Sequence, residues 1–336
     1  MKAFNFFLFL LLIAGPIQAQ DGLPIIDMHL HASAADVNGP PPIAVCAPFN
    51  EMPVWDQRMP YGAFFMQVLK NPTCDNPVWG PETDREVMEQ TIEAMDTYNV
   101  VQGVLGGSPQ RVKQWIDEAP GRFIPGINFN IDSPNAIEPD SLRKLFDNGS
   151  VEVFAEITNQ YTGTTPDDER MQPYWALAEE MDIPVGIHIG PGPPGVLYLS
   201  GSGYRARLHS PLILEDILAS HPRLRIYIMH AGYPMLDDLL AVLYTHPQVY
   251  VGIGVIVYTQ PEAAFYRFLK GIVEAGFGKR IMFGSDQMNW PGVIGPSIDR
   301  IREAPFLTEE QKRDILYNNA ARFLRLSEEE IRQHHD

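Results

Sequence analysis

Short runs of apolar residues alternate with segments in which apolar residues recur at helical spacing, from residue 24 almost to the end of the chain. Eight of the runs have the length of buried strands, and segments such as EVMEQTIEAMDTYN (86–99) have the period of amphipathic helices. The expected strands are residues 24–31, 100–106, 123–130, 151–157, 184–189, 224–230, 249–255 and 280–285. Further helices are expected at residues 109–119, 173–182, 211–221, 235–246 and 262–276.

Strands that alternate with helices form parallel sheets, and eight such units fit a closed barrel better than an open sheet. No G-x-G-x-x-G stretch follows a strand, which further disfavours an open dinucleotide-binding sheet. The pattern therefore predicts an α/β fold of the (β/α)8 TIM-barrel type.

Two connections in this pattern are much longer than the rest. Residues 32–81, rich in proline and aromatic residues, follow the first strand, and residues 190–210 follow the fifth. Loops of this length are unusual unless they have a function, and both leave the carboxyl ends of strands, where barrel enzymes build their active sites. We expect a single domain with long loops after strands 1 and 5.

The first residues, MKAFNFFLFLLLIAGPIQAQ, place one lysine before an apolar stretch and then small and polar residues. This is the layout of a secretory signal peptide, expected over residues 1–19, which leaves residues 20–336 as the mature domain. A retained N-terminal anchor is the alternative, but the stretch is shorter than the roughly 20 residues that a membrane-spanning helix needs. We therefore expect an exported protein, periplasmic or secreted, without stable membrane insertion.

The chain is strongly acidic, with 42 Asp and Glu against 25 Lys and Arg and a net charge of −17. The absence of a basic patch makes nucleic acid an improbable partner. Cys46 and Cys74 are the two cysteines, and they are expected either to form a disulfide in an oxidising compartment or to remain buried thiols. Two cysteines cannot form a zinc–cysteine cluster, so a metal ion here would need histidine and carboxylate ligands.

Histidines and an aspartate occur where predicted strands end. In IIDMHLHAS, His29 and His31 lie one residue apart and so share one face of the first strand. A His-x-His pair alone is a weak signal, but His188, His230 and Asp286 close the fifth, sixth and eighth strands. Unpaired polar groups at buried strand ends are costly, so five such groups at one rim of a barrel predict a metal site.

Several stretches together resemble a known family. These are IDMHLH in the first strand, PVGIHIGPG in the fifth, MHAG in the sixth, FGSD in the eighth and the terminal ILYNNAARFLRL (315–326). The chain is similar to the amidohydrolase superfamily, in particular to the amidohydrolase-2 branch of TIM-barrel enzymes that includes aminocarboxymuconate semialdehyde decarboxylase and several lactonases. The resemblance covers nearly the whole mature chain, and it is specific for the branch but not for a substrate.

The resemblance implies that His29, His31, His188 and Asp286 ligate a divalent ion, for which zinc is expected. His230 would lie beside the ion, as a proton donor or as a ligand of a second ion. A metal ion lowers the pKa of water from 15.7 to about 7 to 9, which makes hydroxide available near neutral pH. Asp286 would then relay the proton to the leaving group. The alternative is that Asp286 only caps a helix.

Two further acidic residues each have two possible roles. Glu156, at the end of the fourth strand, lies where some superfamily members carry a carboxylated lysine between two metals, and it could be a metal ligand or pair with other groups at the rim. Asp27 shares the inward face with His29 and His31. It could orient one of these histidines or serve as a buried structural carboxylate.

Four residues of the loops are candidates for substrate binding. Arg205 and Arg207 could form a fork for a substrate carboxylate, or they could simply be solvated. Tyr233 and Trp290 follow the sixth and eighth strands and are candidate pocket walls, with rim packing as the alternative.

The leading functional hypothesis is an exported metal-dependent hydrolase that acts on a lactone, ester or amide bond of a small molecule. The alternative is a metal-dependent, non-oxidative decarboxylase of a carboxylated aromatic or enol. A non-catalytic exported binding protein is a third hypothesis, and a nuclease or phosphoesterase is disfavoured by the acidity of the chain. The pattern carries no signal for oligomeric state.

Overall fold

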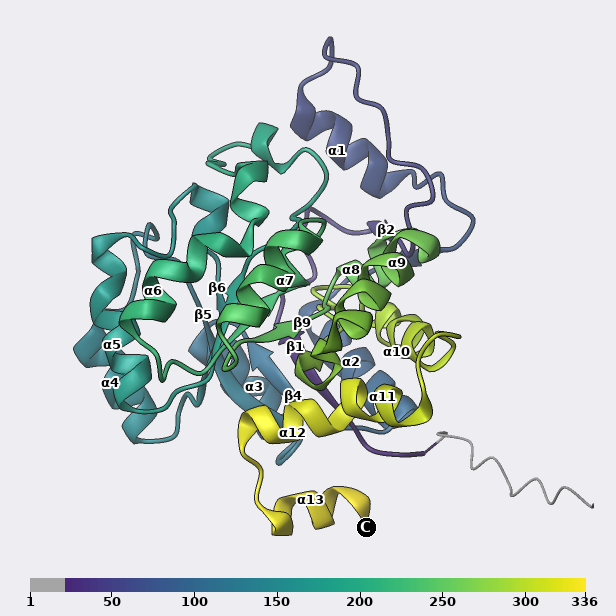
Figure 1. Cartoon of the computed structure of the whole chain (residues 1–336). Helices are drawn as coiled ribbons and strands as arrows, with labels where there is room; N and C mark the ends of the chain where they lie inside the picture. The colour runs from purple at the N-terminus through teal and green to yellow at the C-terminus, as the bar shows by residue number, and fades with distance from the viewer. Residues whose placement is uncertain (1–21) are drawn as a thin grey trace, which may run out of the picture.

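The computed structural model describes residues 22–336, and its main sheet in this part of the chain has eight parallel strands that curl into a barrel surrounded by helices (Figure 1). The strand order is β1-β4-β5-β6-β7-β8-β9-β10, so strands adjacent in the sequence are also adjacent in the sheet. The bounds are β1 Ile25–His31, β4 Val100–Gly106, β5 Phe123–Phe129, β6 Val153–Ile157, β7 Val185–His188, β8 Ile226–Met229, β9 Tyr250–Gly252 and β10 Ile281–Met282. The predicted (β/α)8 barrel is confirmed.

The first and last strands approach each other and nearly close the barrel. The backbone amide of Met28 donates to the carbonyl of Phe283 at 3.0 Å, and that of Asp286 donates to the carbonyl of His29 at 2.8 Å. These hydrogen bonds place the end of β1 beside the segment that follows β10. The seam therefore brings together His29 and Asp286, which are far apart in the sequence but were both predicted to bind metal.

Every second side chain of a strand points into the barrel, and these inward-pointing side chains fill its interior. Met28, Val104 and Tyr227 belong to a buried cluster that is separate from the larger core between strands and helices. Helix α12 (Asn319–Leu324) contributes Phe323 to this cluster, and the Phe323 ring contacts the ring of Tyr227 edge-on at 5.3 Å. The barrel is therefore packed at this level, below the carboxyl ends of the strands.

The predicted helices are present, with small shifts at their ends: α2 Asp84–Tyr98, α3 Pro109–Glu118, α5 Gln172–Glu180, α6 Glu215–Ser220, α7 Leu236–Thr245 and α9 Glu262–Ile272. The pattern analysis did not predict α4 (Pro139–Asp147) or α10 (Ile294–Arg302). Helix α4 is short, with only Leu142 fully buried, and α10 carries Gly295 and Pro296 in its first turn, which in a sequence favour a turn or a loop. The remaining helices are α8 Ile256–Thr259, α11 Glu309–Arg313 and α13 Glu328–His335.

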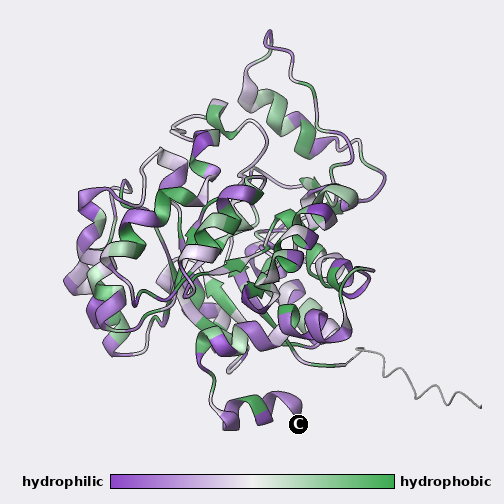
Figure 2. Cartoon of the chain, viewed as in Figure 1, coloured by the Kyte–Doolittle hydropathy of each residue, from purple (hydrophilic) through white to green (hydrophobic). Residues whose placement is uncertain are grey.

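The long segment at residues 32–81, here called the insertion, has structure of its own. Strand β2 (Ala44–Cys46) pairs antiparallel with β3 (Pro77–Trp79), and helix α1 (Tyr61–Lys70) lies between them in the sequence. In Figure 1 the helix projects beyond the barrel, and in Figure 2 much of it is coloured as hydrophobic. Strands of three residues carry too few positions for a readable period, whereas α1 has ten residues and was missed within a segment interpreted as a proline-rich loop.

The insertion is held by a disulfide between Cys46 and Cys74, the first of the two alternatives expected for these residues. The bond closes a loop across a sequence separation of 28 and fastens β2 to the segment after α1. Loop closure of this length removes conformational entropy from the unfolded chain.

Replacing both cysteines by serine is expected to lower the free energy of unfolding by about 3 to 4 kcal/mol, because the unfolded chain regains the freedom that the disulfide removes. Guanidinium titration of the wild type and of the Cys46→Ser/Cys74→Ser variant measures the difference. A reducing agent should bring the wild type close to the variant and leave the variant unchanged. A difference below about 1 kcal/mol would contradict this account.

No helix within residues 22–336 combines the length and the apolar character needed to cross a bilayer. The predicted signal peptide, residues 1–19, lies outside the described residues.

Candidate metal centre

Six ionisable side chains meet at the carboxyl end of the barrel, and here they are called the rim cluster. All six are at most 12% exposed. They are His29 and His31 of β1, Glu156 of β6, His188 of β7, His230 directly after β8 and Asp286 in the segment that follows β10. The structure thus brings together every residue proposed above as a ligand or proton carrier, including Glu156.

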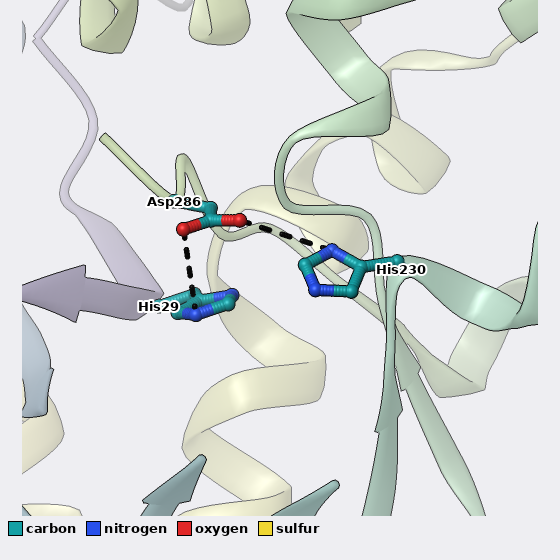
Figure 3. Close-up of side chains that lie close together, drawn as sticks. All are labelled: His29, His230 and Asp286. Carbon is teal, nitrogen blue, oxygen red and sulfur yellow. Dashed lines mark ion pairs between the residues drawn. The ribbon is translucent and has the colours of Figure 1, made fainter. Parts of the chain in front are cut away.

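One half of the cluster lies at the seam between β1 and β10. The Nε2 atoms of His29 and His31 are 2.9 Å apart. Asp286 Oδ1 lies 2.9 Å from Nε2 of His31 and 3.6 Å from Nε2 of His29. On its other side Asp286 Oδ2 lies 3.9 Å from Nδ1 of His230, so the carboxylate stands between two histidines (Figure 3).

Glu156 organises the other half. Its Oε1 lies 2.9 Å from Nδ1 of His188, and that nitrogen is 2.9 Å from Nε2 of His230. Its Oε2 lies 3.9 Å from Nε2 of His29, so Glu156 reaches both halves. His230 Nδ1 donates to the carbonyl of Gly254 at 2.9 Å, and this bond leaves Nε2 of His230 directed at Glu156 and His188.

Burial and charge fix the protonation states of the rim cluster. Burial lowers the pKa of His29 to about 3 and that of His188 to about 4, so both imidazoles are neutral near pH 7. Burial alone would raise the pKa of Glu156 and Asp286. The hydrogen bonds from His188 to Glu156 and from His31 to Asp286, with the electrostatic effect of the surrounding histidines, outweigh it, and the pKa of both carboxyls is lowered. The same carboxylates outweigh burial at His31 and His230 and raise the pKa of both imidazoles. Metal ions bind neutral imidazoles and ionised carboxylates, so a metal ion would displace any proton on His31 and His230.

The donors also fit a divalent cation by their arrangement. Within residues 22–336, three overlapping groups each place their ligand atoms within 4.8 Å of one another: His29–His230–Asp286, His29–His31–Glu156 and Glu156–His188–His230. In addition, Nε2 of His188 is buried without a hydrogen-bond partner. Imidazole nitrogens and carboxylate oxygens together are a donor set suited to zinc and similar ions. Since the groups share members, they suit one ion or a close pair.

Asp27 and Gln287 position the ligands through the backbone. Asp27 Oδ1 accepts hydrogen bonds from the amides of His29 at 2.9 Å and Ser285 at 3.0 Å, and so it ties β1 to the segment after β10. Gln287 exchanges two hydrogen bonds with the backbone of His31, at 3.0 and 2.8 Å. Asp27 therefore orients the strand rather than an imidazole ring, which combines the two alternatives considered above.

The backbone at the rim is strained. His230, Val255, Asp286 and Met288 all have φ between +48° and +61°, a region that residues other than glycine seldom adopt. For Val255 this is a marked outlier, because its branched side chain crowds the backbone there. Such strain persists only where the surrounding structure imposes it, and it is concentrated at functional sites.

Gly284 shows how tightly His29 is held. A Cβ atom added at Gly284 would lie 2.9 Å from Cβ and 3.3 Å from the amide nitrogen of His29. We therefore expect Gly284→Ala to displace His29 and to weaken metal binding by about tenfold or more, as loss of a supporting contact does elsewhere. Titration with a competing chelator measures the affinity. The control is Gly62→Ala in α1, where an added Cβ meets nothing within 4 Å; equal affinities for both variants would refute the prediction.

A cavity of about 770 Å³ opens over the rim cluster. Its lining includes His31, Glu156, His188 and Asp286 together with side chains of the insertion and of the loop after β7. The volume is within the range of small-molecule sites.

The predicted substrate-binding residues divide into two pairs. Tyr233 and Trp290 line the cavity. Arg205 and Arg207 do not belong to its lining: both are exposed, and Arg205 donates to the carbonyls of Gly203 and Tyr204. The structure therefore does not bring the proposed arginine fork to the site.

Three polar side chains, Arg111, Asn128 and Tyr161, are among the lining residues that were not predicted from the sequence. Arg111 enters the cavity from α3, Asn128 from the end of β5, and Tyr161 from the turn after β6, where its ring lies 4.6 Å from that of His188. Burial raises the pKa of Tyr161 well above its usual value, so its phenol stays protonated and can donate a hydrogen bond. Asn128 could have been found as a polar residue at a strand end, whereas nothing in the sequence distinguishes Arg111 or Tyr161.

Comparison with known protein sequences identifies one family. A family model described as Amidohydrolase matches residues 26–326. No curated protein matches the chain significantly.

Solved structures resemble the fold at low sequence identity. An uncharacterized TIM-barrel protein from Bordetella bronchiseptica aligns with a TM-score of 0.57 and 17% identity, over 90% of this chain and 99% of that one. A probable 2-pyrone-4,6-dicarboxylic acid hydrolase from Acinetobacter baumannii aligns at 0.56 and 14%, over 90% and 100%. A 5-carboxyvanillate decarboxylase from Sphingomonas paucimobilis aligns at 0.55 and 16%, over 91% and 100%. These similarities support the same barrel fold.

Proposed function

Because the chain belongs to the amidohydrolase family, we propose that it is a metal-dependent hydrolase that cleaves a lactone, ester or amide bond of a small molecule. The observation that carries the proposal is the rim cluster, in which four histidines and two ionised carboxylates lie together at one end of a barrel. Four of the six residues line a single cavity: His31, Glu156, His188 and Asp286.

The residues suited to hold the metal are His29, His31, His188 and Asp286, with Glu156 and His230 available for a second ion. A bound divalent ion would supply Lewis acidity and lower the pKa of water, and we propose zinc as this ion. Asp286, ionised and close to three histidines, is placed to accept a proton and pass it on. Tyr161 presents a protonated phenol on the same side of the cavity and can donate to a substrate oxygen.

The charge of the cavity supports hydrolysis over decarboxylation. Among the described residues that line it, Glu156 and Asp286 are anionic and Arg111 is the one Lys or Arg. Arg111 already donates to Asp84 at 2.7 Å. With a divalent ion offsetting the two carboxylates, a substrate with several carboxylates would still meet a single cationic side chain here, whereas an uncharged ester or lactone needs none.

Decarboxylation of a carboxylated aromatic or enol is the second candidate. A decarboxylase is among the structures that share the fold, and Arg111 offers one cation for a single carboxylate. In this reaction the residues of the rim cluster would position the substrate and a proton would replace CO₂.

Oxygen isotopes separate the two reactions. The metal-loaded enzyme is incubated in H₂¹⁸O with lactones, esters and amides, and separately with hydroxybenzoates. Hydrolysis places ¹⁸O in the released acid, while decarboxylation releases CO₂. CO₂ from a benzoate with no ¹⁸O in any acid product would overturn the hydrolase proposal in favour of the second candidate.

We also propose export with removal of residues 1–19, to the periplasm or outside the cell. The disulfide Cys46–Cys74 supports this, because such bonds persist in oxidising compartments. Expression in a bacterial host with mass analysis of each cell fraction tests it. A chain beginning near residue 20 in the periplasm or medium is expected, and an intact chain confined to the cytoplasm would refute it.

A further inference from the structure

We infer that the ligand of the cavity is a molecule with a bulky apolar body and at most one anionic group, and that the insertion contacts the apolar body. The inference rests on the proposed function only in identifying this ligand with the substrate. It concerns residues 32–81 and 190–210, whose sequence gives no indication of specificity.

The insertion supplies an apolar wall. Val45, Phe49, Met52, Phe65 and Leu69 all line the cavity, and they come from β2, from α1 and from the chain between them. None of these side chains can pair with a polar substituent. An apolar group placed against them removes its own surface and theirs from water, which is the main source of affinity in pockets of this kind.

Other parts of the lining are also apolar. Val255, Met288 and Trp290 contribute from the segments after β9 and β10, and Trp290 Nε1 donates to the carbonyl of Ile43 in the insertion at 3.4 Å. Pro191 and Pro193 contribute from the loop after β7. With a volume of about 770 Å³, the cavity exceeds what a small carboxylic acid fills and accommodates a ligand of several rings or a long alkyl chain.

Contacts between the insertion and the loop after β7 roof the cavity. The ring of Trp55 lies 5.1 Å from that of Tyr61 and 5.1 Å from that of Tyr198, measured between centroids. The Tyr61 hydroxyl donates to the carbonyl of Pro194. The apolar wall is therefore fixed over the rim cluster by contacts at its outer edge as well as by the disulfide within the insertion.

Arg111 sets the limit of one anionic group. Its Nη1 donates to Asp84 Oδ2 at 2.7 Å, and Asp84 Oδ1 accepts from the amide of Ala35 at 2.8 Å. The guanidinium is thus oriented and keeps further N–H groups for a ligand. Among the described lining residues it is the single Lys or Arg, so an anionic group of the ligand's body, away from the metal ion proposed for the rim cluster, has one cationic side chain to pair with.

A matched pair of fluorescent probes tests the ligand class directly. 1-Anilinonaphthalene-8-sulfonate carries an apolar body and one anionic group, and N-phenyl-1-naphthylamine is the same body without the charge. We expect saturable binding of both to the folded, metal-loaded mature protein. Arg111→Gln should weaken binding of the sulfonate about fivefold or more and leave the uncharged probe within about twofold.

Adjacent residues of α1 give a control for the apolar wall. Phe65 lines the cavity, whereas Phe64 does not and instead faces a separate surface pocket beside Cys74. Phe65→Ser should weaken both probes about tenfold, and Phe64→Ser should leave them within about twofold. Circular dichroism of each variant confirms folding. Equal losses in the two variants, or no saturable binding to the wild type, would overturn the inference.

Measurements of turnover distinguish a failure of this inference from a failure of the proposed function. For γ-lactones of increasing alkyl chain length, we expect kcat/KM to rise with length in the wild type and to rise less in Phe65→Ser. If no lactone, ester or amide is cleaved but the probes behave as expected, the inference stands and the hydrolase proposal fails. If lactones are cleaved with kcat/KM independent of length and the probes do not bind, hydrolysis stands and the inference is overturned.

Discussion

Replacing Asp286 by Asn is expected to lower kcat by about 10³-fold, within the range of 10² to 10⁴ that a positioned acid–base group contributes. Asparagine keeps the size of the side chain but removes the negative charge that lies 2.9 Å from His31 and 3.9 Å from His230. The variant can neither accept the proton nor balance the charge of the metal site.

The measurement compares kcat of the two proteins after each has been loaded with zinc and its metal content determined, because Asp286 is also a proposed ligand. Asp314 provides the control: it is also buried, at 4% exposure against 5%, but it pairs with Lys279 on another face of the molecule. Asp314→Asn should keep kcat within about threefold. Unchanged kcat in metal-loaded Asp286→Asn would eliminate the proton-transfer role.

Removing the two histidines of β1 is expected to lower metal affinity by more than 100-fold, since loss of a ligand exceeds the effect of 10- to 100-fold seen when a supporting contact is lost. Elemental mass spectrometry of the mature wild-type protein should find one or two divalent ions per chain, and His29→Ala/His31→Ala should retain less than about a tenth of this after dialysis. His334→Ala/His335→Ala removes two histidines of the C-terminal helix and should leave the metal content unchanged.

The number of ions decides the role of Glu156. With two ions per chain in the wild type, Glu156→Gln should reduce the content toward one, because Glu156 belongs to two of the three donor groups. With one ion per chain and no change in Glu156→Gln, Glu156 acts by holding His188. Absence of metal from the wild type, with none taken up on zinc titration, would refute the metal centre itself.

The barrel could be predicted because its strands are continuous apolar runs of distinct length, and parallel strands buried on both faces leave that signature. The clustering of His29, His188, His230 and Asp286 followed from the same rule, since the carboxyl ends of parallel strands meet at one rim. For these residues, a position at the end of a strand was enough information.

Other features depend on contacts that the sequence does not record. The role of Asp27 is decided by two backbone amides, one of them on the segment after β10. Arg111 lies in an ordinary helical pattern and reaches the cavity only through the packing of α3. Arg205 and Arg207 had the right chemistry for substrate binding, but the turn that carries them faces solvent. Loop residues are placed by tertiary structure, and no local pattern predicts that placement.

The disulfide-bonded insertion also bears on how an enzyme of this kind can change over evolution. Its hairpin, helix and disulfide join parts of the insertion to one another, whereas the catalytic groups are anchored by the barrel seam. Mutations at Phe49 or Phe65 can therefore reshape the apolar wall while the positions of His29 and Asp286 are inherited unchanged. On the inference made above, substrate preference depends on the insertion and the chemistry on the rim cluster, so engineered exchange of residues 32–81 between relatives is a practical route to altered substrate range.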